Sequence, residues 1–269
     1  MLFRSPGEHR NLRGVECLDG TVLVDQSPIG KTARSNPASY VGALDPIRKL
    51  FATAPMARER GYGPGMFSFN AARGRCPTCG GSGFEHVEMQ FLSDVYLRCP
   101  DCDGKRFRPE VLEVKLARRR QPRSIAEVLD MTVTEACDFF ALDEAVLVAL
   151  EPLQGVGLGY LRLGQPVPTL SGGEAQRLKL AGFLARSADR PRRPGGTLFL
   201  FDEPTTGLHM ADIEVLLTAL RRLVAAGHSV VVIEHNLDVI QACDWVVELG
   251  PEGGEAGGML VAAGVPSDL

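Results

Sequence analysis

The sequence lacks any apolar run of about 18 residues, so no membrane-spanning helix is expected. Residues 1–6 contain no apolar core of the kind found in a secretory signal peptide. A strong charge of one sign is also missing, because the formal net charge is only −4 over 269 residues. No global basic field therefore points to nucleic acid. These absences predict a cytoplasmic protein without a membrane partner, in which any contact with DNA would need a local basic patch.

A disulfide framework is not expected either, although the sequence holds seven cysteines. Four of them form two C-x-x-C pairs, whose inner cysteines are separated by nineteen residues. In a reducing compartment this spacing indicates a zinc site with four cysteine ligands. The candidate ligands are Cys76, Cys79, Cys99 and Cys102. Four thiolates leave no open coordination position, so the predicted zinc ion is structural rather than catalytic.

The segment between the two cysteine pairs alternates over residues 84–97, which predicts a β-hairpin. His86 lies in this segment and is interpreted as a surface strand residue rather than a fifth metal ligand. Folding of such a small unit depends on its metal. The cysteines do not reveal whether the unit binds DNA or protein.

A complete phosphate-binding P-loop is missing. Gly30-Lys31-Thr32 ends like the motif G-x-x-x-x-G-K-[ST], but Asp25 stands where the first glycine is required. Asn36 and Pro37 follow instead of a helix, so we reject this segment as a phosphate cradle. No other Gly-Lys-Ser or Gly-Lys-Thr occurs in the sequence.

The stretch LSGGE at residues 170–174 is nevertheless built to receive an anion. It precedes a predicted helix from about Glu174 to Ala185, whose N-terminus carries about half a positive charge. Gly172 and Gly173 let main-chain N–H groups approach a phosphate closely. The plainer alternative is that Ser171 and Glu174 form a helix capping box.

Three predicted strands end in polar residues. The first predicted strand covers residues 21–24, shortly before Gln26. The second covers residues 197–201 and is followed by Asp202 and Glu203. The third covers residues 229–233 and is followed by Glu234 and His235. Asp202 could hold Mg²⁺ through water, and Glu203 could act as general base on an attacking water. His235 could donate a hydrogen bond to a γ-phosphate. The alternatives are a polar loop residue for Gln26, a helix cap for the carboxylates and a structural role for the histidine.

Several further elements follow from periodicity and capping signals. Helices are predicted over residues 45–54, 146–153 and 208–224, and capping boxes at Ser124 and Thr132 open two short helices. Residues 245–249 and 259–262 are predicted to be the final strands of the sheet. Phe67 and Phe69 are interpreted as packing residues of an alternating strand.

One run of basic residues is the strongest candidate for a local DNA contact. It consists of Lys115, Arg118, Arg119, Arg120 and Arg123. The alternative interpretation is a solvated loop.

The order of these motifs resembles that of ABC-type ATPases, and taken together they resemble the C-terminal half of the UvrA family. UvrA is the damage-recognition ATPase of bacterial excinuclease ABC. Besides the two C-x-x-C pairs, the segments that carry the resemblance are VDQSPIGKT at 24–32, GLGYLRLGQ at 157–165, LSGGE at 170–174, DEPTTGLH at 202–209 and EHNLD at 234–238. The resemblance runs from about residue 20 to the end of the sequence.

The resemblance implies an α/β fold: an incomplete ABC-type, P-loop NTPase-like ATPase core with a helical signature domain and an inserted four-cysteine zinc module. Residues 1–45 would be a partial ATP-binding lobe with the Q-loop, and residues 46–195 the signature domain. The zinc module would be inserted at about residues 73–110. Residues 196–269 would form the lobe with Walker B and the switch histidine.

The resemblance also implies residue roles. Gln26 would be the Q-loop glutamine, and Ser171, Gly172 and Gly173 the signature. Asp202 would be the Walker B carboxylate, Glu203 the catalytic base and His235 the switch histidine. The implied cofactors are structural Zn²⁺ and ATP with Mg²⁺, the nucleotide being bound in a composite site with a partner.

The implied partners are double-stranded DNA and a UvrA-type chain or a second copy of this chain. Proteins of the UvrA family carry two ABC units, each with its own phosphate-binding loop, whereas this sequence matches only the later part of the second unit. UvrB is a less expected partner because the family's UvrB-binding region lies in the other half. The isolated chain is predicted to hydrolyse ATP negligibly and to expose apolar sheet edges.

Two alternatives remain open from the sequence. One is a non-hydrolysing, zinc-containing module that binds DNA or a partner protein. The other is a UvrA-like paralogue that protects against DNA-binding drugs.

Overall fold

The computed structural model describes residues 10–27, 29–30, 32, 34–87, 95–118, 121–187, 195–250 and 258–268. Its helices are α1 (Pro37–Tyr40), α2 (Leu44–Ala52), α3 (Pro55–Glu59), α4 (Pro109–Leu112), α5 (Ile125–Leu129), α6 (Val133–Phe139), α7 (Glu144–Gln154), α8 (Gly172–Ser187), α9 (Met210–Ala225) and α10 (Leu237–Gln241). Its strands are β1 (Gly20–Val24), β2 (Phe84–Val87), β3 (Val95–Arg98), β4 (Thr197–Asp202), β5 (Ser229–Ile233), β6 (Val246–Gly250) and β7 (Met259–Gly264).

The centre of the α/β part is a parallel sheet in the order β1-β4-β5. Val24 lies opposite Phe201, and Phe201 lies opposite Val232, so the three strands end at the same edge. Phe199 and Phe201 of the middle strand are fully buried, as expected for an apolar strand with neighbours on both sides. The predicted mixed α/β fold with a parallel sheet is confirmed.

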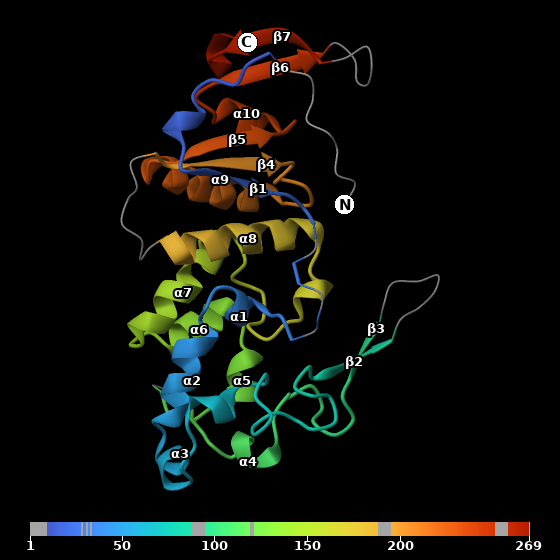
Figure 1. Ribbon diagram of the computed structural model, residues 1–269, viewed down its shortest axis with the longest axis vertical. Helices are drawn as coiled ribbons and strands as arrows, with labels where there is room; N and C mark the ends of the chain where they lie inside the picture. The colour runs from blue at the N-terminus through green and yellow to red at the C-terminus, as the bar shows by residue number, and fades with distance from the viewer. Residues whose placement is uncertain are drawn as a thin grey trace.

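Helix α8 lies between this sheet and a block of helices that includes α2 and α5 to α7 (Figure 1). Leu178 and Ala181 are fully buried on α8, and Phe183 meets Phe199 edge-on at 4.4 Å between ring centroids. The helix begins at Gly172, two residues before the predicted start. Its N-terminal residues therefore lie close to the sheet edge at which the strands end.

The helical block is organised by the capping residues that the sequence predicts. Ser124 and Glu127 form a reciprocal capping box at the start of α5, and Thr132 and Glu135 form one at α6. Each box satisfies two amide groups that a helix start leaves free, which contributes about 1 kcal/mol per helix. The domain bounds assigned from the sequence stay a prediction.

The strand prediction for Phe67 and Phe69 is wrong, although their predicted packing is confirmed. Both rings are fully buried, but Pro64–Phe67 form a 3₁₀ turn. Proline has no main-chain N–H and has a fixed φ, which suits the first position of a helical turn better than the interior of a strand. Alternating phenylalanines here reflect two inward-facing positions of an irregular loop.

The prediction that the last strands join the main sheet is also wrong for the described residues. Strand β6 pairs with β7 in a separate antiparallel sheet, and the register shifts between Glu248 and Leu249. Figure 1 shows this pair beyond α10 and β5. Sequence periodicity identifies a strand but not its neighbour, so the two strands themselves are correctly predicted.

Apolar side chains are exposed on β5 and on β6. On β5, Val231 and Ile233 are 48% and 63% exposed, and on β6 Val247 and Leu249 are 57% and 65% exposed. Within the described ranges, β5 pairs only with β4. The expected exposure of apolar sheet edges is confirmed. In the same ranges, no helix is both long enough and apolar enough to cross a membrane.

Candidate functional site

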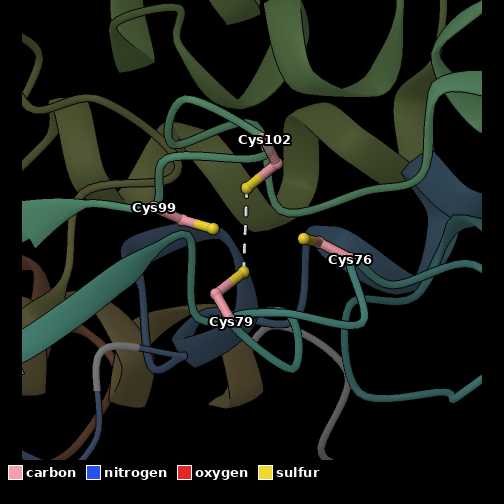
Figure 2. Close-up of side chains that lie close together, drawn as sticks. All are labelled: Cys76, Cys79, Cys99 and Cys102. Carbon is pink, nitrogen blue, oxygen red and sulfur yellow. Dashed lines mark hydrogen bonds between the residues drawn. The ribbon is translucent and has the colours of Figure 1, made fainter.

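The four predicted zinc ligands lie together at the base of the β2–β3 hairpin (Figure 2). One sulfur from each of Cys76, Cys79, Cys99 and Cys102 lies within 4.8 Å of every other, and the Cys79 and Cys102 sulfurs are 3.7 Å apart. A zinc ion with four sulfur ligands at about 2.3 Å needs sulfur–sulfur separations of about 3.8 Å. We call this group the four-cysteine cluster, and its donor set and spacing fit zinc.

Main-chain geometry supports the four-cysteine cluster. The Gly83 N–H donates a hydrogen bond to the Cys79 sulfur at 3.3 Å, and donors of this kind orient the ligands of zinc sites. Gly81 has a φ of 88°, and a Cβ there would lie only 2.0 Å from the Phe69 carbonyl oxygen. Burial raises the pKa of the Cys102 thiol, so a bound cation would be needed to keep it as a thiolate. The side chain of His86 lies outside the described residues.

The predicted nucleotide residues gather where β1 and β4 end. Gln26 donates a hydrogen bond from Nε2 to the Glu203 carbonyl oxygen at 3.2 Å. A Cβ on Gly172 would lie 3.2 Å from Gln26 Oε1, and one on Gly173 would lie 2.9 Å from the Thr206 carbonyl oxygen. Glycine at position 173 is therefore needed for the close approach of α8 to the strand ends, and a side chain at position 172 would displace Gln26. The structure therefore brings Gln26, Gly172 and Glu203 close together.

Ser171 and Glu174 form the reciprocal contacts of a capping box. The Ser171 N–H donates to Glu174 Oε2 at 2.8 Å, and the Glu174 N–H donates to Ser171 Oγ at 3.3 Å. Tyr160 donates from its hydroxyl to the other carboxylate oxygen at 2.8 Å. The amides of Gly172 and Gly173 are the first two of α8, so no carbonyl of the helix accepts from them. The capping box and an anion site at these amides are therefore compatible.

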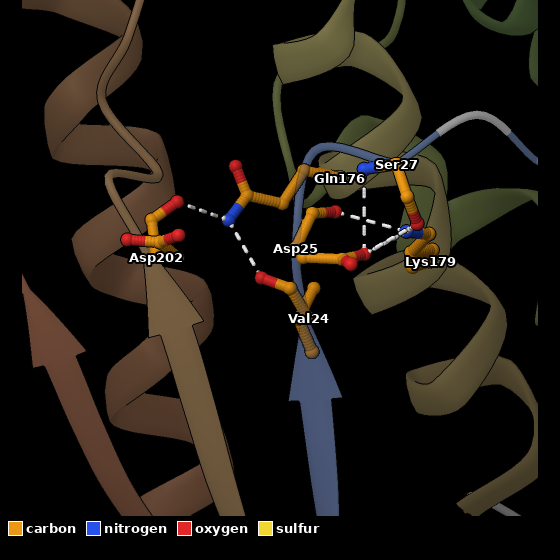
Figure 3. A network of polar contacts seen from close by, with 6 residues as sticks. All are labelled: Val24, Asp25, Ser27, Gln176, Lys179 and Asp202. Atoms are coloured by element: carbon orange, nitrogen blue, oxygen red, sulfur yellow. Dashed lines mark hydrogen bonds and ion pairs between the residues drawn. The ribbon is translucent and has the colours of Figure 1, made fainter. Parts of the chain in front are cut away.

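A buried glutamine of α8 joins the ends of β1 and β4 (Figure 3). Gln176 is 1% exposed, and its Nε2 donates to the Val24 carbonyl oxygen at 2.8 Å and to the Asp202 carbonyl oxygen at 3.0 Å. Its Oε1 has no hydrogen-bond partner among the described groups. Gln176 thus fixes α8 against the two strand ends that carry Gln26 and Asp202.

One turn farther along α8, Lys179 holds the residue before Gln26. Its ammonium group contacts Asp25 Oδ1 at 2.5 Å, the Asp25 carbonyl oxygen at 2.9 Å and Ser27 Oγ at 2.9 Å (Figure 3). The hydrogen bonds from Lys179 and Ser27 lower the pKa of Asp25. This ion pair is largely shielded, because the side chains are 19% and 32% exposed.

Glu203 has a left-handed main chain with a φ of 45°, which costs free energy for any residue other than glycine. The Glu234 carboxylate holds the loop that follows Glu203. One carboxylate oxygen accepts from the N–H and hydroxyl of Thr205 at 2.8 and 2.6 Å, and the other accepts from the His235 N–H at 3.1 Å. The side chains of Glu203 and His235 line one open cleft with Thr206.

The described members of the basic run already have acidic partners. Lys115 contacts Glu127 at 2.6 Å, Arg118 contacts Asp143 at 2.7 Å, and Arg123 lies 3.7 Å from Glu127. Arg119 and Arg120 lie outside the described residues, as does Lys31 of the rejected phosphate loop. The run is therefore weaker as a DNA-contact candidate than its sequence suggests.

Comparisons with known proteins show which sequences and structures the chain is similar to. No protein-family profile matches the chain. UvrABC system protein A of Thermus thermophilus is 57% identical over 265 residues, which cover 98% of this chain and 27% of that protein. The protein of the same name from Methanothermobacter thermautotrophicus is 55% identical over 263 residues, covering 98% and 26%. The chain is homologous to part of UvrABC system protein A.

A solved structure supports the same relationship. The crystal structure of UvrA2 from Deinococcus radiodurans matches with a TM-score of 0.85 and 51% identity, over 95% of this chain and 30% of that chain. The chain thus spans about a quarter of the length of the curated UvrABC system protein A sequences it matches.

Some residues that shape the site have no signal in the sequence pattern. Gln176 and Lys179 lie on the helix that follows the LSGGE stretch, yet their partners Val24 and Asp25 are more than 150 positions away in the sequence. Glu234 gives no signal beyond its place next to His235. Spacing along the helix shows that Gln176 and Lys179 share a face, but not that this face meets the end of β1.

Proposed function

We propose that this chain forms part of a UvrA-like DNA-damage recognition ATPase that acts in nucleotide excision repair. Its identity of 53% or more to several UvrABC system A proteins supports this assignment. The observation that carries the nucleotide role is the convergence of Gln26, Gly172 and Glu203 at one end of the sheet. Helix starts, strand-end carboxylates and a glutamine side chain are the groups that phosphoryl-transfer sites use.

Each group at this edge has a role that its chemistry supports. The Gly172 and Gly173 amides would donate hydrogen bonds to a phosphate, strengthened by the dipole of α8. Asp202 would bind a water ligand of Mg²⁺, which supplies charge neutralisation at the phosphates. Glu203 would accept a proton from the attacking water, and His235 would donate to a phosphate oxygen. The four-cysteine cluster would hold a structural zinc ion that fixes the hairpin.

The lysine loop that an ATPase of this type needs would come from another polypeptide segment. The sequence holds no complete Walker A motif. Strand β5, which ends next to His235, has one edge without a partner among the described strands, and Val231 and Ile233 are exposed on it. A partner chain of the UvrA type or a second copy of this chain could complete the site. Double-stranded DNA is the proposed binding partner, and UvrB is a less expected partner.

The experiment is an ATPase assay with and without a full-length UvrABC system protein A. We expect the chain alone to show no turnover above background. Adding the chain should change the ATP turnover rate of the full-length protein. The Glu203→Gln chain should change that rate by a different amount. The Glu248→Gln chain, altered at an exposed glutamate of β6, should act like the original chain. Turnover by the chain alone that Glu203→Gln abolishes would contradict the composite site.

A second assay addresses DNA. Binding to damaged and intact duplexes is measured across a salt series, because contacts with phosphates weaken steeply with salt. We expect binding only when the partner chain is present. Equal, salt-independent retention of both duplexes would argue against the DNA role.

A further inference from the structure

One buried charged side chain belongs to a residue whose main chain is hydrogen-bonded to the four-cysteine cluster. Arg106 is 3% exposed and follows the second cysteine pair. Its guanidinium carbon lies 5.3 Å from the centre of the Phe69 ring and 5.8 Å from that of Phe84. Its main chain has a φ of 70°, a strained value for arginine. A buried cation on a strained main chain needs strong local compensation.

The four-cysteine cluster is placed to supply part of that compensation. The Arg106 carbonyl oxygen accepts a hydrogen bond from the Cys76 N–H at 2.8 Å, which ties the two segments together. Burial lowers the pKa of Arg106 to about 10, and negative charge at Cys79 and Cys102 opposes that shift. A zinc ion with four thiolate ligands carries a formal net charge of about −2, so a neighbouring guanidinium is attracted to the loaded site.

The guanidinium itself reaches a different part of the chain. Arg106 Nη2 donates a hydrogen bond to the Gly164 carbonyl oxygen at 2.8 Å. Gly164 is itself fixed, because its N–H donates to the Leu129 carbonyl oxygen at 2.7 Å. A Cβ at this position would lie 2.9 Å from that same oxygen, so only glycine fits.

Gly164 begins the segment that leads into α8. Within residues 164–171, which we call the α8 entry segment, the Val167 N–H donates to the Ser35 carbonyl oxygen at 2.8 Å. The segment ends at Ser171, whose N–H donates to Glu174. Arg106 therefore contacts Cys76 of the four-cysteine cluster through its main chain, and it contacts the segment that sets the start of α8 through its side chain.

We propose that Arg106 is a positioning residue that couples metal loading of the four-cysteine cluster to the α8 entry segment. The loaded cluster holds the guanidinium in place, and the guanidinium holds Gly164 and hence the approach to Ser171. Loss of the metal removes the fixed negative charge, which weakens the hold on Gly164. The inference rests on the proposed zinc site and adds to it a residue and a route to the phosphate-binding helix start.

Three variants of the full chain test this coupling. Arg106→Met removes the charge and the hydrogen bond but keeps a side chain of similar length on the same strained main chain. Arg106→Lys keeps the charge but loses the planar fork that contacts Gly164. Arg98→Met is the matched control, because Arg98 lies on the same hairpin and is 71% exposed.

Zinc release to a chromogenic chelator and the absorption bands of the cobalt-substituted protein report on the metal. We expect Arg106→Met to release zinc about 10-fold faster or more, as loss of a group that supports the ligands does at other zinc sites. Arg106→Lys should release zinc nearly as slowly as the original chain, and Arg98→Met should match it. All forms that fold should show the bands of tetrahedral cobalt.

Hydrogen exchange of the peptide covering residues 163–171 reports on the coupling. We expect slow exchange in the loaded original chain, and faster exchange after metal removal and in both Arg106 variants even when loaded. Unchanged zinc release and unchanged exchange in both Arg106 variants would overturn the proposal. If Arg106→Met fails to bind cobalt, hydrogen exchange of residues 163–171 in loaded Arg106→Lys decides the question. Faster exchange than in the original chain supports the coupling, and unchanged exchange overturns it. If the original chain takes up neither zinc nor cobalt, the proposed zinc site itself fails, which is distinct from failure of the coupling.

Discussion

Replacing Gln176 with leucine should show how strongly α8 is fixed to the ends of the strands. The side chain is 1% exposed, and its two hydrogen bonds reach the Val24 and Asp202 carbonyl oxygens. Leucine fills a similar volume but leaves both oxygens without this donor.

The expected loss follows from opposing contributions. Each lost hydrogen bond to a buried carbonyl costs about 1 to 1.5 kcal/mol, so two cost about 2 to 3 kcal/mol. Removal of the unpartnered Gln176 Oε1 and gain of apolar burial return about 1 kcal/mol. We therefore expect Gln176→Leu to lower the free energy of unfolding by about 1 to 2 kcal/mol.

The assay is urea unfolding of the full chain followed by circular dichroism at about pH 7.5. Gln241→Leu is the matched control, because Gln241 is an exposed glutamine on helix α10. The reasoning is refuted if Gln176→Leu and Gln241→Leu unfold at the same urea concentration as the original chain.

Gln176→Glu adds a test by pH. A carboxylate would face two carbonyl oxygens in a buried site, so its pKa in the folded state would be raised above the unfolded value of about 4.3. The folded state then binds more protons than the unfolded state above that pH, and stability falls as the pH rises. We expect Gln176→Glu to be clearly less stable at about pH 7.5 than at about pH 5, a trend that Gln176→Leu should not show.

Two further predictions concern the ion pair and the metal. Lys179 lowers the pKa of Asp25, so the pair stabilises the fold above the unfolded pKa of about 3.9, and this contribution is lost as the pH falls through the lower folded value. Lys179→Met should therefore lower the free energy of unfolding by about 1 to 2 kcal/mol at pH 7 and by much less at pH 2. Urea titrations measure this loss, with Lys49→Met as the exposed control. An equal loss at both pH values would contradict the pairing. Cys102→Ser should reduce bound zinc from about one ion per chain and lower the melting temperature, whereas Cys243→Ser, outside the four-cysteine cluster, should leave zinc content unchanged by elemental analysis.

Local chemistry explains which features could be predicted from the sequence. The capping boxes at Ser124 and Thr132 involve residues three positions apart, so their contacts depend only on the helix start. The four-cysteine cluster was also predictable, because two short turns and a hairpin bring four sulfurs together. The α/β order of the strands around LSGGE followed from apolar runs that end in polar residues.

Long-range geometry explains the remainder. Strands β6 and β7 were predicted as strands, but whether they extend the main sheet depends on which edges meet in space. The partners of Lys115, Arg118 and Arg123 could not be inferred either, since acidic residues elsewhere in the sequence are equally available before folding.

Residue identity and short spacing alone predicted the donor types: four cysteines, two glycines at a helix start, and acidic and histidine side chains after apolar strands. These depend on residue identity and short spacing, which folding does not alter. Only the folded chain shows that Gln176 holds the ends of β1 and β4, that Lys179 holds Asp25 after β1, and that Arg106 connects the four-cysteine cluster to Gly164. Such contacts join segments separated by 26 to 154 positions, and only packing of the helices on the sheet brings those atoms within hydrogen-bonding distance.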